Sequence, residues 1–408
     1  MRDAFDLLVI GAGASGLTAA ISGARGGASA VVLERLPRAG KKLLATGGGR
    51  CNLLNDSLSA SAFKSMAPGL VSSVFKRFGQ AEIRGFFEGL GLRLQTDESG
   101  RVYPATNQAA SVLKVLELET VRLGVAVKTG FEAERIDASF GGYSVAAADG
   151  RKIAGRRIVL AGGGRSYPAL GSNGSCYGLA EAFGHRIVSP VPSAVPLLVR
   201  DWICHVLQGQ RLRARIESRV GGRPGRTAEG ELLFTQYGLS GTAVLDVSES
   251  LSIALNRDGQ KNAAVVVDLV PDMSQKDMAG EFARRLEAGW AVEDLAAGIL
   301  PEKFAMVLPR LLREAGLPDV KGKQREAAQV AAAALKSKIF SVQGTRGWNE
   351  AEFTSGGVDA RDVMPRTLES RLRKGLYFAG EVLDVQGGRG GYNLAWAWAS
   401  GYVAGLGE

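Results

Sequence analysis

The chain has 408 residues, of which 46% are hydrophobic, and this predicts a globular protein of two or three domains. Its 50 basic and 41 acidic residues give a net charge of +9, and no apolar stretch reaches the ~18 residues that a membrane span needs. The apolar run near the start is too short for a signal peptide. Three widely spaced cysteines indicate neither a disulfide framework nor a redox dithiol. We therefore expect a cytoplasmic protein that does not associate with a membrane.

The two histidines disfavour two classes of enzyme. His185 and His205 fit neither a metal-ligand spacing nor a Ser/His/Asp order. We accordingly predict no metal site, and we disfavour a hydrolase or a metalloenzyme.

Residues 6–34 have the pattern of a strand, a glycine turn, a helix and a second strand that ends on an acid. Gly11 permits the tight turn, Gly13 lets the backbone approach a pyrophosphate, and Gly16 lets the helix lie close to the sheet. Glu34 follows Gly13 by 21 residues, about where an acid binds the ribose of a dinucleotide. The acid favours a free ribose 2′-hydroxyl, so the motif predicts a site for FAD or NAD rather than NADP.

A glycine- and lysine-rich loop follows at residues 40–52. Beyond it, the sequence predicts short helices at 58–66, 70–78 and 80–90, a helix at 108–122 and a strand at 125–128. Two hairpin turns, Gly141-Gly142 and Asp149-Gly150, predict a small antiparallel meander at about 131–156. The strand at 157–160 then leads into glycines and is expected to return to the parallel sheet.

Three prolines at 190, 192 and 196 mark a boundary. Beyond it, the sequence predicts strands at 211–220, 231–235, 242–247 and 264–269, then helices at 275–287, 301–315 and 322–336. A late strand at 374–381 and a small-residue helix at 394–406 end the chain. We expect a nucleotide-binding α/β domain built from 1–194 and 346–408, with an inserted β domain at 195–270 and a helical subdomain at 271–345.

Basic residues gather at the start of this insertion. Seven arginines face two acids between residues 200 and 226, a local charge of +5. Such a surface attracts anionic small molecules or nucleic acid. A solvated strand face is the favoured interpretation.

Six segments spread over nearly the whole chain carry a resemblance to a known family. They are residues 9–16, 40–55, 160–178, 230–248, 354–358 and 375–401, and they include the specific pair Gly-Arg-Cys-Asn (49–52) and Gly-Gly-Tyr-Asn-Leu (390–394). The chain resembles the bacterial FAD-dependent flavoproteins of the "aminoacetone oxidase family / NAD(P)/FAD-dependent oxidoreductase" group. These have the glutathione-reductase-like FAD fold, and they include bile-acid 4,6-dehydro reductases. The chain departs from the family pattern at Leu54, Gln236, Thr242, Gln386 and Ala395.

The resemblance implies a Rossmann FAD domain, with a parallel sheet and a β-meander, that is interrupted by a β-barrel-like and helical insertion. It places the pyrophosphate at the glycine turn, the ribose at Glu34, the ribityl–phosphate part at Glu381 and the flavin at the two specific motifs. The implied cofactor-binding residues are Gly11, Gly13, Ala14, Ser15, Gly16, Glu34, Arg35, Lys42, Gly49, Arg50, Cys51, Asn52, Ala161, Gly162, Gly380, Glu381, Gly391, Asn393 and Leu394. Catalytic residues are not identified.

Among these residues, Arg50 could offset the charge of the flavin or of the substrate, or it could anchor the glycine loop. A small packed residue is the favoured role for Cys51, and core packing is favoured for Trp396 and Trp398. We expect an FAD-dependent oxidoreductase that transfers a hydride between flavin N5 and a small organic substrate, either anionic or neutral, with reduction of an activated C=C bond as the leading form. The alternatives are a flavin-dependent amine oxidase and an FAD-dependent tRNA-modifying protein. NAD(P)H is a possible transient reductant, and nucleic acid is not an expected partner.

Overall fold

The computed structural model describes residues 5–139 and 141–407, which divide into two compact units. Unit 1 comprises Met1–Pro190 and Phe353–Glu408, and unit 2 comprises Val191–Glu352. Each described unit has its own hydrophobic core. Unit 1 therefore comes from both ends of the chain.

The central sheet of unit 1 is parallel around the strand that precedes the glycine turn. Its order is β7 (Ala126–Lys128), β2 (Ala30–Leu33), β1 (Phe5–Ile10), β10 (Lys152–Leu160), β9 (Gly142–Ala147) and β8 (Ala133–Ser139), and β20 (Leu376–Phe378) pairs with β10. The first half of β10 runs antiparallel to β9, and its second half lies parallel to β1 and β20. The carboxyl ends of β1, β10 and β20 consequently meet at one edge, where ligands of open α/β sheets bind.

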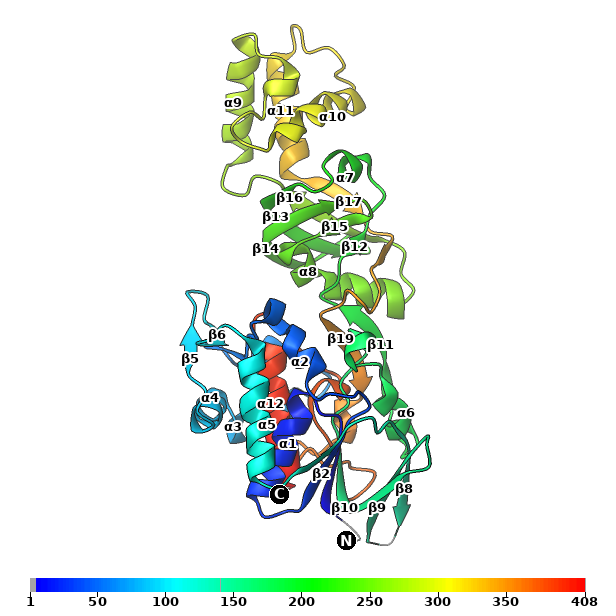
Figure 1. Cartoon of the computed structure of the whole chain (residues 1–408). Coiled ribbons are helices and arrows are strands. Elements are labelled where there is room, and N and C mark those ends of the chain that lie inside the picture. The colour runs from blue at the N-terminus through cyan, green and yellow to red at the C-terminus, as the bar shows by residue number, and fades with distance from the viewer. Residues whose placement is uncertain (1–4, 140, 408) are drawn as a thin grey trace. The chain divides into compact units, whose positions relative to one another are not determined.

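The helices of unit 1 pack against this sheet or against one another. They are α1 (Ala14–Arg25), α2 (Lys41–Ala45), α3 (Pro68–Arg77), α4 (Gln80–Gly89), α5 (Ala109–Arg122), α6 (Ser175–Glu181) and α12 (Tyr392–Leu406). The first and last helices, α1 and α12, pack side by side, and α5 contacts α1 (Figure 1). A Cβ atom at Gly401 or Gly405 would overlap the backbone of α1, so small residues set this close approach.

The long C-terminal helix also buries both of its tryptophans, which confirms their predicted packing role. Trp396 donates from Nε1 to the carbonyl oxygen of Gly380 at 3.2 Å, and Trp398 donates to that of Leu53 at 3.1 Å. Each indole N–H therefore has the partner that burial demands.

Short strands complete unit 1. One small sheet has the order β3 (Leu54–Asn55), β6 (Arg101–Pro104) and β5 (Leu94–Thr96); β4 (Phe63–Ser65) pairs with β21 (Val385–Gly387), and β11 (Ile187–Ser193) pairs with β19 (Phe353–Val358). The helix predicted at 58–66 is therefore wrong, because Phe63 pairs with Gly387 across the β4–β21 ladder and is buried there.

Unit 2 contains a seven-stranded sheet and a group of helices. The sheet has the order β17 (Lys338–Ser341), β16 (Ala263–Asp268), β13 (Arg211–Val220), β14 (Arg223–Thr235), β15 (Gly238–Ser240), β12 (Leu197–Leu198) and β18 (Gly344–Thr345). Its helices are α7 (Trp202–Val206), α8 (Thr242–Ser252), α9 (Gln275–Glu287), α10 (Leu308–Glu314) and α11 (Gln324–Lys336).

The strand predicted at 242–247 is wrong, because this segment begins helix α8. Its buried residues Val244, Val247 and Leu251 recur at the spacing of one helix face.

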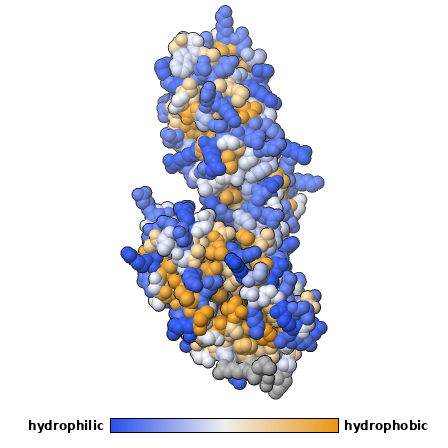
Figure 2. Space-filling view, in the orientation of Figure 1, coloured by the Kyte–Doolittle hydropathy of each residue, from blue (hydrophilic) through white to orange (hydrophobic). Residues whose placement is uncertain are grey.

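The visible surface is mixed in character. Figure 2 shows hydrophobic residues gathered on the front of unit 1, where Figure 1 places α5. Leu118 and Val121 of this helix have 54% and 76% of their surface exposed.

Candidate functional site

The turn between β1 and α1 is shaped by three glycines with different roles. Gly11 has φ +102°, and a Cβ there would lie 2.6 Å from the carbonyl oxygen of Ala161. At Gly16 a Cβ would overlap the carbonyl oxygen of Gly11. Gly13, the N-cap of α1, is different, because no described atom would lie within 4 Å of its Cβ beyond its chain neighbours and the helix backbone. The backbone at Gly13 thus faces open space at a helix N-terminus, as phosphate binding requires.

Glu34 is held against this turn at the end of β2. It is 8% exposed, and its Oε2 accepts a hydrogen bond from the N–H of Ala12 at 2.8 Å. Its Oε1 accepts from the N–H of Leu36 at 2.8 Å. Each carboxylate oxygen has a further lone pair, so Glu34 can still accept from a ribose hydroxyl. The adjacent Arg35 pairs with Glu132 at 3.3 Å.

Positions at the carboxyl ends of β10 and β20 close around the same turn. Ala161 donates its N–H to the carbonyl oxygen of Ile10 at 2.9 Å, and a Cβ at Gly162 would overlap the sulfur of Cys176. Gly380 has φ +76°, and a Cβ there would lie 2.5 Å from Oγ of Ser15. These positions therefore require small residues for packing.

A polar network joins Lys42 on α2 to Glu381 after β20. Lys42 Nζ lies 2.6 Å from Oε2 of Glu381 and donates to Oγ of Ser166 at 2.7 Å. The other oxygen of Glu381 accepts from Ser166 Oγ at 3.0 Å and from the N–H of Thr354 at 2.7 Å. Ser166 and Thr354 were missed by sequence reasoning, although Thr354 begins one of the segments that carry the family resemblance. The network connects four segments that lie far apart in the sequence.

The loop before β3 holds the Gly-Arg-Cys-Asn motif. Cys51 has φ +59° and is buried, and burial raises the pKa of its thiol to about 12. The thiol is therefore protonated at neutral pH, as expected of a packed rather than a reactive cysteine. Gly49 and Arg50 are exposed, and Arg50 donates from Nε to the carbonyl oxygen of Gly47 at 3.3 Å.

Asn52 of the same motif lies beside Gly391, the residue that precedes helix α12. A Cβ at Gly391 would lie 2.9 Å from Oδ1 of Asn52, so the two motifs meet in space. This Oδ1 is buried and has no hydrogen-bond partner among the described residues. This oxygen can therefore accept a hydrogen bond from a bound molecule or from an ordered water.

The remaining two predicted residues belong to the first turn of α12. Asn393 accepts from the N–H of Gly387 at 2.9 Å and donates to the carbonyl oxygen of Gly387 at 3.0 Å. Its amide thus fixes the preceding loop. Leu394 is half-buried beside it.

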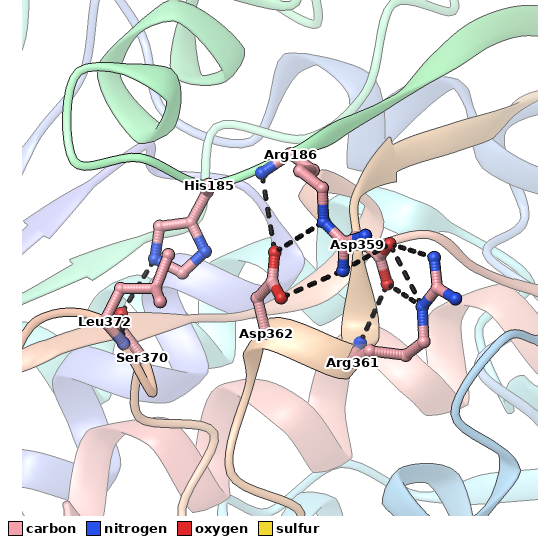
Figure 3. Close-up of polar contacts among 7 residues, drawn as sticks. All are labelled: His185, Arg186, Asp359, Arg361, Asp362, Ser370 and Leu372. Carbon is pink, nitrogen blue, oxygen red and sulfur yellow. Dashed lines mark hydrogen bonds and ion pairs between the residues drawn. The ribbon is translucent and has the colours of Figure 1, made fainter.

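A separate polar cluster lies elsewhere in unit 1 (Figure 3). Arg361 binds Asp359 through Nε at 2.9 Å and Nη2 at 2.6 Å, and Arg186 pairs with Asp359 at 3.3 Å and with Asp362 at 3.2 Å. The hydrogen bonds from Arg361 hold the pKa of the Asp359 carboxyl below its usual range. The cluster ties the start of β11 to the segment after β19.

His185 lies beside this cluster, and its Nε2 forms a hydrogen bond with Oγ of Ser370 at 2.7 Å. Its Nδ1 is buried and has no hydrogen-bond partner among the described residues. Burial lowers the pKa of its imidazole.

Within residues 5–139 and 141–407, no three His, Cys, Asp or Glu side chains form a group that could hold a metal ion. Over the same residues, no helix has the length and apolarity to cross a membrane.

Comparison with known proteins gives a match over nearly the entire chain. The family described as "HI0933-like protein Rossmann domain" matches residues 5–407. The 3-dehydro-bile acid delta(4,6)-reductase of Clostridium scindens is 38% identical over 407 residues, covering 97% of each chain. The ribosomal RNA dihydrouridine synthase of Escherichia coli is 29% identical over 401 residues, covering 98% of this chain and 96% of the relative.

A solved structure shares the fold. The 3-ketosteroid delta1-dehydrogenase of Sterolibacterium denitrificans aligns over 99% of both chains with a TM-score of 0.53 and 13% identity. Within the site, the open space at Gly13 and the unpartnered Oδ1 of Asn52 fit a dinucleotide that carries a flavin. The chain therefore belongs to the HI0933-like Rossmann-domain family and is an FAD-dependent oxidoreductase.

Proposed function

We propose that the protein reduces a C=C bond conjugated with a ketone in a small, apolar-bodied substrate. The observation that carries this proposal is the 38% identity, over 97% of each chain, with the relative named 3-dehydro-bile acid delta(4,6)-reductase. The geometry of the dinucleotide turn, where Glu34 accepts the N–H of Ala12, supports the binding of such a cofactor.

We infer that FAD is held at two clusters of residues in unit 1. The first lies at the carboxyl ends of β1, β2, β10 and β20, and it consists of Gly11, Gly13, Ala14, Ser15, Gly16, Glu34, Arg35, Ala161, Gly162, Gly380 and Glu381. The second lies between the loop at 42–52 and the start of α12, and it consists of Lys42, Gly49, Arg50, Cys51, Asn52, Gly391, Asn393 and Leu394.

FAD, once reduced, supplies the hydride that a C=C bond accepts at its β-carbon. The chain has to orient that carbon, exclude water and provide a proton for the α-carbon. The N-terminus of the 15-residue α12 carries a partial positive charge, which would stabilise negative charge that develops near it. Substrate and product differ by two hydrogens, so a separate reductant must restore the cofactor. We expect NAD(P)H to dock transiently in this role.

The test is anaerobic reduction followed by rapid mixing with a panel of oxidants. The panel contains a neutral steroid 4-en-3-one, its saturated ketone and O₂, and primary amines are mixed with the oxidised protein. We expect the enone to restore the oxidised flavin spectrum faster than O₂ does, while the saturated ketone has no effect. Reoxidation by O₂ alone, with reduction of the oxidised protein by amines, would instead identify an amine oxidase.

A second candidate is reduction of a pyrimidine in ribosomal RNA, which the name of the E. coli relative favours. The arginine-rich strand β13 lends this candidate little support, because its charges are paired. Arg211 pairs with Glu231 at 3.0 Å, and both Arg213 and Arg215 pair with Glu229 at 2.7 and 3.1 Å. Incubation of the reduced protein with unmodified ribosomal RNA, followed by nucleoside mass spectrometry, separates the two candidates.

A further inference from the structure

Of the chain's two histidines, His185 belongs to neither cofactor cluster and is buried, with 3% of its surface exposed. It lies between α6 and β11, and its ring meets that of Phe378 of β20 edge-on, with centroids 4.7 Å apart. Its Nε2 lies 2.7 Å from Oγ of Ser370, which directly precedes the turn before β20 (Figure 3). His185 thus joins the segment after α6 to the turn that leads into β20.

The hydroxyl of Ser370 holds this turn, which spans residues 371–375. Its Oγ accepts the backbone N–H of Leu372 at 3.0 Å and that of Arg373 at 2.8 Å. The backbone N–H of Ser370 donates to the carbonyl oxygen of Leu376 at 2.7 Å. Ser370 is 4% exposed, so bulk water does not compete for its oxygen.

These contacts determine which nitrogen of His185 carries the proton. A serine hydroxyl has one donor and two lone pairs. The N–H groups of Leu372 and Arg373 occupy both lone pairs, so the O–H of Ser370 donates to Nε2. A ring nitrogen that accepts carries no proton, so the proton of the neutral ring is on Nδ1. The geometry therefore requires a neutral His185 that is protonated at Nδ1.

Protonation of the ring would break this arrangement. The new proton would lie on Nε2 and point at an oxygen that has no lone pair left. Ser370 could accept it only by turning its own O–H away and giving up, wholly or in part, the N–H of Leu372 or of Arg373. The turn would therefore lose a hydrogen bond when His185 is protonated.

The acids near His185 do not compensate for protonation, because they already have partners. Burial lowers the pKa of the imidazole, and the charge of Asp362 opposes this only in part. Asp362 is paired with Arg186 at 3.2 Å, and the buried Asp359 is paired with Arg361 at 2.6 Å. Arginines thus neutralise both carboxylates.

The turn and the segment before it also carry charged groups. The carboxylate of Glu369 accepts the backbone N–H of Gly375 at 2.7 Å. The turn itself carries three exposed basic side chains, those of Arg371, Arg373 and Lys374. Positive charge in this turn opposes the addition of a proton to the imidazole.

We propose that His185 is a pH-sensitive latch on the turn at residues 371–375. The latch is closed while the neutral imidazole accepts the hydroxyl of Ser370, and it opens when Nε2 is protonated. The turn leads through β20 to Gly380 and Glu381, so the latch lies in the segment that carries part of the first cofactor cluster. It does not depend on which substrate the protein reduces.

The first measurement determines the tautomer of His185 in the wild-type holoprotein. Nitrogen NMR of histidine-labelled protein can be assigned directly, because the chain contains only His185 and His205 and the variant His205→Gln removes the signals of the second. At about pH 8 we expect a proton on Nδ1 of His185 and none on Nε2. A proton on Nε2, or a charged ring at this pH, would overturn the latch.

The second measurement follows amide hydrogen exchange of Leu372 and Arg373 between about pH 8 and about pH 5. Rates are corrected for the intrinsic effect of pH and compared with those of β10 in the same sample, so that global opening is recognised. We expect the relative protection of the two amides to fall by roughly 2- to 10-fold on acidification, since one hydrogen bond contributes about that factor. In His185→Gln their protection should not change with pH, because the glutamine side chain does not titrate.

His205→Gln is the matched control, since His205 is exposed on α7 of unit 2 and the substitution is chemically the same. This variant should keep the fall in protection that the wild type shows. Protection that stays constant with pH in the wild type, or a fall that persists in His185→Gln, would overturn the proposal. If His185→Gln does not fold, the tautomer and the exchange rates of the wild type still decide the question.

Discussion

The ammonium nitrogen of Lys42 lies 2.6 Å from a carboxylate oxygen of Glu381, a residue 339 positions further along the chain. Lys42 belongs to the short helix α2, and Glu381 follows β20 at the edge of the central sheet. Ser166 and Thr354 bind the same carboxylate. The pair thus fastens the N-terminal loops of unit 1 to the segment that returns after unit 2.

A double-mutant cycle measures the coupling energy between Lys42 and Glu381. We expect Lys42→Met and Glu381→Gln each to lower the free energy of unfolding of the apoprotein, and the double variant to lose less than the sum. A coupling energy of about 0.5–3 kcal/mol is typical of residues that share one network. Denaturant titration of the four proteins gives the value, and strict additivity would show that the contact contributes no stability.

Gly13 is the position where a side chain should affect cofactor binding more than folding. Its Cβ would meet no described atom within 4 Å beyond its neighbours, so Gly13→Ala should leave the apoprotein as stable as the wild type. The methyl group would occupy the space where the pyrophosphate meets the helix N–H groups. Loss of one or two charge-assisted hydrogen bonds weakens FAD binding by roughly 10-fold or more.

Gly85 of helix α4 provides the control for this prediction, because a Cβ there also meets nothing within 4 Å. Flavin fluorescence titration of the apoproteins should give the Gly85→Ala variant the affinity of the wild type. Equal affinities in the Gly13 and Gly85 variants would place the pyrophosphate away from this turn.

Because α1 and α12 approach closely, a substitution at Gly401 should affect folding, in contrast to the substitution at Gly13. A Cβ at this position would overlap the carbonyl oxygen of Ser15, so Gly401→Ala should lower the free energy of unfolding by about 1–3 kcal/mol. In Gly178→Ala, where the added atom meets nothing within 4 Å, stability should not fall. Chemical denaturation of both variants decides the matter, and an unaffected Gly401 variant would contradict this packing.

Burial of His185 predicts a dependence of stability on pH. Burial lowers the pKa of this imidazole from its usual 6.5, so the unfolded chain binds the proton more tightly than the folded protein. The stabilisation is present above pH 6.5 and is lost as the pH falls toward the lowered pKa. Denaturant titrations between about pH 7.5 and about pH 5 should show this loss in the wild type.

Substitution identifies the responsible histidine. His185→Gln should reduce the slope of stability against pH, whereas His205→Gln should keep it, because His205 is exposed on α7. An unchanged slope in the His185 variant would assign the effect to other groups.

The parts of the fold that could be predicted from the sequence depend on short-range patterns. Gly11, Gly13 and Gly16 between two apolar runs predict the βαβ unit, and the structure has β1, α1 and β2 there. The meander at 131–156 is likewise present as β8, β9 and the first half of β10, because its glycine turns are local signals.

The predictions for residues 58–66 and 242–247 are wrong, because tertiary contacts determine the secondary structure of these two segments. Ala243, Val244 and Val247 are apolar residues whose short run fits either a strand or a helix, and burial on one helix face selects the helix. Phe63 becomes part of a strand only because β21, over 300 residues away in sequence, pairs with it.

Contacts within the site also depend on the fold and could not be predicted from the local sequence. Lys42 and Glu381 were each predicted as cofactor-binding residues, but nothing local indicates that they contact one another. Ser166 and Thr354 have common side chains, one in the segment after β10 and the other in β19, and only the fold places them on Glu381. The contact between Arg50 and the ring of Tyr103 likewise depends on the strand order of a small sheet.

A single anaerobic turnover shows whether bound FAD reduces a conjugated C=C bond. Holoprotein is reduced with one equivalent of dithionite, mixed with a neutral steroid 4-en-3-one, and quenched once the oxidised flavin spectrum has returned. We expect one equivalent of a product two hydrogens heavier than the enone, with its ketone retained. Return of the oxidised spectrum without that product, or a reduced flavin that the enone leaves unchanged, would contradict it.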